Sequence, residues 1–202
     1  MSKISDYLFN INIPSQFVPA VGNILVAEPM LRENYFNHAV ICIFDHEDRG
    51  ETLGVVLNNR SGYQLSQLID GVKEGISIPV FVGGPVATDR LYFLHTLGEI
   101  IPDSREIIPG LWIGGDFEAM LKYVNDGYPV DGNMRFFVGY SGWSPGQLSE
   151  ELSRHVWAVA QPPEAGVLMA PPGDDSLWHE LVRRLGPSYR AWRFHPRDTT
   201  AN

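Results

Sequence analysis

The sequence contains a single cysteine, Cys42, among its 202 residues. One thiol cannot form a disulfide within the chain, and the apolar neighbours of Cys42 predict a buried strand in which the thiol behaves as a small hydrophobic group. The chain also has no cysteine pair of the kind that zinc sites use. The six histidines show no ligand spacing either, so we expect no metal and no cofactor.

Long apolar runs are also missing, because none approaches the roughly 18 residues that a transmembrane helix needs. The N-terminal residues lack the apolar segment and the small-residue cleavage site of a secretory signal. We therefore expect a soluble, cytoplasmic protein that makes no use of a membrane.

Basic residues are few, since 15 Lys and Arg stand against 24 Asp and Glu and give a net charge of −9. Affinity for DNA comes largely from Lys and Arg, and the basic groupings here are isolated pairs such as Arg183 and Arg184. A helix-turn-helix needs two adjacent helices joined by a short turn, with basic residues on the second helix, and the sequence shows no such pair. Direct nucleic-acid binding is disfavoured.

What is present is the composition of a globular protein, with 44% hydrophobic and 19% charged residues. No repeat, low-complexity tract or long linker divides the chain. We expect a single domain over residues 1–202, with a core at about 22–190 and a polar, disordered tail at 195–202.

Apolar runs separated by turn-forming residues predict strands at 23–27, 39–44, 53–57, 79–82, 91–97, 107–113, 134–138 and 157–160. Helical spacing predicts helices at 65–72, from Asp116 to a stop at Gly127, from Ser144 to about Val156, and from Asp175 to Leu185. Strands occur in adjacent pairs as well as alternating with helices. The fold class expected is α+β, with a mixed sheet.

Residues 139–151, GYSGWSPGQLSEE, combine a strand exit, a glycine-opened bend and a helix start. Ser144 as N-cap, Pro145 at the first helical position and Gln147 at the third would form a capping box. This explains most of the segment structurally. A second interpretation stays open, in which the glycines bring backbone N–H groups close to a ligand at the helix N-terminus.

We assign no catalytic residue. A nucleophile elbow needs Gly-x-Ser-x-Gly. With Ser141 as the serine, the second glycine of the motif would fall at position 143, which is Trp143. Gly83 and Gly84 could form an anion nest, although a tight turn explains them more simply.

The strings GGPV at 83–86, LVAEP at 25–29, LGVVLN at 53–58 and GYSGWSPGQLSEEL at 139–152 resemble the bacterial AlgH/YqgE family. The resemblance covers residues 22–185. It implies a single α+β unit with a bifurcated β-sheet folded into a pseudo-barrel, in a bacterial cytosolic protein that carries a transcriptional-regulator label. Ser141 departs from the alanine expected in many members.

By resemblance, the family's signature positions are our candidate ligand-binding residues: Asn58, Gly83, Gly84, Pro85, Gly139, Tyr140, Gly142, Trp143, Gln147 and Glu151. The leading hypothesis is a small-ligand or protein-binding module with an indirect regulatory role. The alternative is an enzyme acting on a small polar or phosphorylated metabolite, with Glu151 as general acid or base. The third is a DNA-binding transcriptional regulator, suggested by the family label alone.

Overall fold

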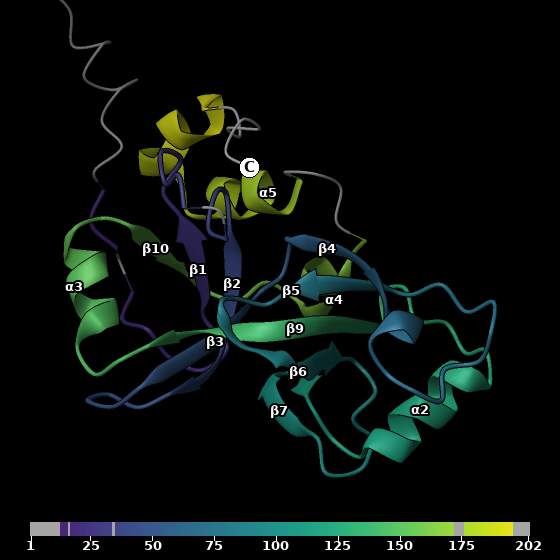
Figure 1. The fold of residues 1–202 in the computed structure, drawn as a ribbon. Coiled ribbons are helices and arrows are strands. Elements are labelled where there is room, and N and C mark those ends of the chain that lie inside the picture. The colour runs from purple at the N-terminus through teal and green to yellow at the C-terminus, as the bar shows by residue number, and fades with distance from the viewer. Residues whose placement is uncertain (1–12, 16, 34, 172–175, 196–202) are drawn as a thin grey trace, which may run out of the picture.

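The computed structural model describes residues 13–15, 17–33, 35–171 and 176–195, and its centre is one large β-sheet (Figure 1). Within these residues the sheet has ten strands in the order β10-β1-β2-β3-β9-β6-β8-β7, and β5 and β4 branch from β9. The strands are β1 (Ile24–Ala27), β2 (Val40–His46), β3 (Thr52–Val56), β4 (Arg60–Gln64), β5 (Pro79–Val82), β6 (Val86–His95), β7 (Arg105–Ile108), β8 (Leu111–Ile113), β9 (Met134–Trp143) and β10 (Trp157–Ala160).

Strand β9 is the branch point of the sheet. One of its edges pairs parallel with β5 from Phe136 to Val138, then antiparallel with β3 from Ser141 to Trp143. Its other edge pairs with β6. In Figure 1 β9 spans the molecule and joins the two groups of strands. The sheet is therefore bifurcated, and the α+β class expected from the sequence is confirmed.

Three glycines allow the fork. Gly83 donates its N–H to Val138 on β9 at 2.8 Å and accepts the N–H of Val56 on β3 at 2.9 Å, so it bridges the two diverging strands. A Cβ on Gly83 would lie 2.3 Å from the carbonyl oxygen of Gly139, and one on Gly139 would lie 2.6 Å from that of Gly84. Only glycine permits such close backbone approach.

Helices cover both faces of the sheet. They are α2 (Phe117–Asn125), α3 (Gln147–Ser153), α4 (Ala165–Met169) and α5 (Ser176–Arg184), with 3₁₀ segments η1 (Leu65–Gln67) and η2 (Pro187–Phe194). Alternate residues of β1 point to opposite faces, as in any strand. Ile24 and Val26 pack with Trp178 of α5, whereas Leu25 packs with Leu148 of α3.

Short-range signals predicted several elements correctly. Asp116 caps α2 by accepting the N–H of Ala119 at 2.7 Å, and Gly127 follows the helix with φ +79°. The β2–β3 hairpin and the strands at 79–82 and 157–160 also lie as expected. The predicted cap Asp175 and residues 196–202 of the predicted tail lie outside the described residues.

The helix predicted at 65–72 is wrong. Only the 3₁₀ segment η1 forms, and Ile69 and Val72 pack on the core from an irregular segment. Gly71 adopts φ +91° next to them, a conformation that ends helical geometry. Strand β4 was not predicted, because its mostly exposed residues show no apolar alternation.

Three strand predictions have wrong bounds. The strand predicted at 91–97 is β6, which begins earlier, at Val86, and ends at His95. The run at 107–113 is a hairpin of β7 and β8, with a turn at Pro109 and Gly110, on the outer edge of the sheet. Strand β9 continues to Trp143 instead of ending at Val138, because β3 replaces β5 as its partner beyond the fork.

Candidate ligand pocket

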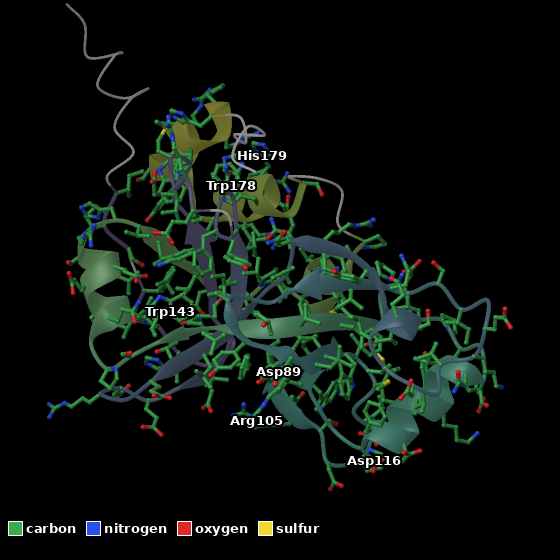
Figure 2. The ribbon with its side chains drawn as sticks, in the orientation of Figure 1. Asp89, Arg105, Asp116, Trp143, Trp178 and His179 are labelled. Atoms are coloured by element: carbon green, nitrogen blue, oxygen red, sulfur yellow. The ribbon has the colours of Figure 1, made fainter. Side chains whose placement is uncertain are left out.

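A pocket of about 360 Å³ lies where the end of β9 meets α3 and the start of β10. Figure 2 shows Trp143 beside α3. The pocket is lined by Leu31, Glu33, Phe36, Pro85, Ser141, Gly142, Trp143, Gln147, Glu151, Arg154, Val156 and Trp157. Aromatic and aliphatic side chains supply the apolar wall, and two carboxylates, an amide and a guanidinium supply its polar groups. Pockets of this size and mixed character hold small molecules in many proteins.

Glu151 is the best-anchored polar group of the pocket. Its Oε2 accepts the indole N–H of Trp143 at 2.8 Å and that of Trp157 at 2.7 Å. Its Oε1 accepts from the side-chain amide of Gln147 at 2.9 Å. A carboxylate offers about four acceptor positions, so these three donors leave one, on Oε1.

The two indoles are themselves held in place. Trp143 is 4% exposed and Trp157 is 2% exposed, and their rings meet edge to face with centroids 6.0 Å apart. Phe36 adds a second edge-to-face contact with Trp157 at 5.5 Å. The donors to Glu151 are therefore rigid, and the carboxylate position is fixed from both sides.

Helix α3 begins differently from the capping box predicted at Ser144. Because β9 runs to Trp143, residues 144–146 form the turn, and Gly146 is the N-cap with φ +82°. Gln147 is the first helical residue and accepts the backbone N–H of Ser144 through Oε1 at 3.1 Å. The side chain of Gln147 thus links the turn to Glu151. Leu148, Leu152 and Val156 lie on one side of the helix region predicted from Ser144 to about Val156, and they pack on the core.

A sequence profile described as AlgH-like matches residues 24–190. The chain belongs to the AlgH-like family. Relatives include UPF0301 proteins of Parabacteroides distasonis, 38% identical over 186 residues, and of Bacteroides thetaiotaomicron, 37% identical over 185 residues; each alignment covers 92% of both chains. The names of these relatives specify neither a reaction nor a ligand.

Two solved structures share the AlgH-like fold. A crystal structure of a protein from Corynebacterium diphtheriae superimposes with a TM-score of 0.73 at 22% identity, covering 91% of this chain and 96% of the other. The solution structure of the AlgH protein from Pseudomonas aeruginosa gives a TM-score of 0.65 at 27% identity, covering 86% and 93%. The resemblance inferred from the sequence is confirmed.

The candidate residues taken from the AlgH-like signature fall into two groups. Five line the pocket: Pro85, Gly142, Trp143, Gln147 and Glu151. The other five are Asn58, Gly83, Gly84, Gly139 and Tyr140, which lie outside its lining. Three of these are the glycines of the fork. The N–H of Gly83 is already bonded to β9, which leaves it unavailable to the anion nest considered from the sequence.

Asn58 and Tyr140 have identifiable structural contacts. Asn58 is buried, accepts the N–H of Val40 and donates to the carbonyl of His38, both at 2.9 Å, so it fixes the start of β2. Tyr140 packs against Phe44 and Tyr92, with ring centroids 6.4 and 5.7 Å away.

Ser141 is not arranged as a nucleophile. It is 1% exposed, and its hydroxyl donates to the carbonyl oxygen of Gly83 at 3.0 Å. A serine nucleophile transfers its proton to a base such as histidine. A backbone carbonyl oxygen accepts a hydrogen bond but is too weakly basic to take up the proton. The hydroxyl instead adds a further contact across the fork.

The pocket residues that the signature did not supply are Leu31, Glu33, Phe36, Ser141, Arg154, Val156 and Trp157. The first three come from the turns before β2, far from 139–151 in the sequence. Trp157 begins the strand predicted at 157–160, but no local pattern linked it to Glu151.

Metal binding and membrane insertion find no support in the described part of the chain. There, no three His, Cys, Asp or Glu side chains come together as a metal site would require. No helix among the same residues has the length and apolarity needed to cross a membrane.

Proposed function

We propose that this protein is a cytoplasmic binding module whose pocket beside α3 takes a small ligand with an apolar body and a hydrogen-bond donor such as an amine or amide. The observation that carries the proposal is the fixed carboxylate of Glu151. Three protein donors orient it, and its remaining acceptor position, on Oε1, belongs to a residue that lines the pocket. Such preorganised acceptors give specificity without a cost of ordering on binding.

The surrounding groups favour the same ligand chemistry. Glu33 contributes a second carboxylate from an exposed turn, which attracts a cationic or N–H-bearing group. Trp143, Trp157 and Phe36 provide ring surface for the apolar body. Arg154 also lines the pocket, but its guanidinium lies 4.0 Å from the carboxylate of Glu150 on the same helix, which offsets its charge.

Binding is favoured over catalysis because Glu151 has no proton relay among the described residues. A general base passes its proton on, and the three neighbours bonded to Glu151, two indoles and an amide, are too weakly basic to take it up. Ser141, the one hydroxyl of the lining, is engaged with Gly83. An indirect regulatory role would then follow from ligand-dependent contact with another protein.

A screen of amines, amino acids and nucleosides by thermal shift tests this function, supported by native mass spectrometry of the purified protein for a retained molecule. A hit should bind about tenfold more weakly to Gln147→Ala, which removes a polar group of the lining, and to Glu33→Gln, which removes a negative charge from it. Gln161→Ala, an exposed change beyond β10, is the matched control. Equal affinity in all variants would place the ligand elsewhere and refute the pocket assignment.

DNA binding is tested separately. The acidic chain predicts no retardation of double-stranded DNA at physiological salt, because counterion release by Lys and Arg supplies most of such affinity. Tight binding that weakens steeply with added salt would contradict the proposal and favour a transcription factor.

A further inference from the structure

A second feature of the molecule lies away from this pocket and concerns Arg135 of β9. Its side chain is buried, with the residue only 4% exposed. The guanidinium donates to the carbonyls of Leu57 at 3.0 Å and Ala170 at 2.6 Å. A guanidinium has five N–H donors, so three have no acceptor among the residues that the structure describes. A buried cation normally has an anionic partner, because desolvation of the charge is costly.

A second cation lies next to it. Strands β4, β5 and β9 run side by side (Figure 1) and place Arg60, Phe81 and Arg135 on neighbouring strands. The guanidinium carbon of Arg60 lies 5.9 Å from the centre of the Phe81 ring, and that of Arg135 lies 5.1 Å from it. Neither arginine forms an ion pair with a carboxylate in the described ranges.

The proximity of the two charges affects Arg135 directly. Burial, with a smaller contribution from the charge of Arg60, lowers the pKa of Arg135 to about 10. Arg135 still carries its charge at neutral pH. Two guanidinium groups that line one cavity repel each other, and no carboxylate of the described residues is paired with either. An anion between them would relieve both the repulsion and the desolvation.

A small cavity of about 40 Å³ opens between these side chains. Arg60, Phe81 and Arg135 line it together with Asp131 and Met169, the latter at the end of α4. A water molecule needs roughly 10–15 Å³ measured in this way, so the cavity has room for about three water molecules, which suits one compact phosphate group. A larger ligand would insert only a terminal group and leave its body outside.

We propose that this cavity binds a single phosphate group, either inorganic phosphate or the terminal phosphate of a small phosphomonoester, between Arg60 and Arg135. Guanidinium groups present paired N–H donors that match phosphate oxygens. Asp131 is the one carboxylate in the lining, and it opposes the anion. The site gives this chain a second ligand, independent of the one beside α3.

Titration with inorganic phosphate, at an ionic strength kept constant with sodium chloride, tests the proposal. Binding is followed through the NMR signals of the arginine side-chain Nε–H groups, and saturable shifts are expected in the low-millimolar range. Arg60→Gln should weaken binding about tenfold, because one charged donor group is lost. Asp131→Asn should tighten it severalfold, because the opposing charge is removed.

Both variants alter exposed residues, so the fold should remain intact. Arg49→Gln, at the exposed tip of the β2–β3 hairpin, is the control with the same change of net charge. A parallel titration with phosphoserine distinguishes the two sources, since tighter binding of the ester would indicate a ligand body outside the cavity. The proposal is overturned if wild-type protein shows no saturable shift, or if Arg60→Gln and Arg49→Gln behave alike.

Discussion

Replacement of Glu151 by alanine should destabilise the protein far more than a substitution on the exposed side of α3 would. The change removes the acceptor of two indole N–H groups, on Trp143 and Trp157, whose residues are 4% and 2% exposed. A buried donor left without a partner costs roughly 1–3 kcal/mol, which gives about 2–6 kcal/mol for the pair. Water that enters the pocket can replace part of the loss. We therefore expect about 2–4 kcal/mol.

Glu151→Gln should cost less, about 1–2 kcal/mol, because its amide oxygen can still accept from the two indoles while its amide nitrogen faces the donor of Gln147. Glu150→Ala is the matched control on the same helix. Its carboxylate is exposed and lies 4.0 Å from Arg154, an arrangement worth under about 0.5 kcal/mol.

Urea unfolding followed by tryptophan fluorescence and far-ultraviolet circular dichroism measures these differences, provided that the dependence on urea concentration is unchanged among variants. The indole N–H signals of Trp143 and Trp157 give an independent NMR readout, since they should shift in Glu151→Gln. If Glu151→Ala and Glu150→Ala differ by less than about 0.5 kcal/mol, the carboxylate does not hold the two indoles as inferred.

Three further outcomes are expected. Gly84→Ala should prevent folding or cost more than about 3 kcal/mol of stability, because the new Cβ would lie 2.3 Å from backbone atoms of Tyr140. Gly62→Ala, with open space around the new Cβ, should cost about 1 kcal/mol. Similar urea midpoints for the two variants would contradict this. Burial lowers the pKa of His95 in the folded protein, despite its hydrogen bond to Gly114. The unfolded chain therefore binds a proton at His95 near pH 6.5, where the folded protein does not, so the stability should fall as the pH drops below about 6.5. His95→Gln should flatten that pH profile, and an unchanged slope would exclude His95 as its source. Burial raises the pKa of Cys42 to about 12, so a thiol reagent at pH 8 should label it only in urea, and rapid labelling of native protein would show that the thiol is accessible.

Features that depend on a few adjacent residues could be predicted from the sequence. The cap at Asp116 and the β2–β3 hairpin follow from side chains within one turn of the chain. The length of β9 could not, because it is set by β3, a strand that the local pattern at Gly139 does not reveal. The segment 65–72 failed for a related reason, since its helical spacing reflects packing on a core built by other elements.

The candidate pocket, too, could be predicted from the sequence only where its residues are close together in the chain. Residues 139–151 identify the family and supply Trp143, Gln147 and Glu151, so one wall of the pocket was within reach of the sequence. The opposite wall was not, because Glu33 and Phe36 approach it only after β1 and β10 have paired. Arg60 and Arg135 give no local signal either, since adjacent strands rather than spacing bring them together.

The position of β9 in the chain has a consequence for how the protein is made. The strand that joins β3, β5 and β6 is residues 134–143, and β10, which closes the sheet against β1, comes later still. A nascent chain that has emerged only as far as β8 lacks the strand that links β3, β5 and β6, although each of these already has one partner. Such non-local pairing folds slowly and exposes unpaired strand edges meanwhile. The hairpins that precede β9 can therefore join into one sheet only after the last third of the chain has been synthesised.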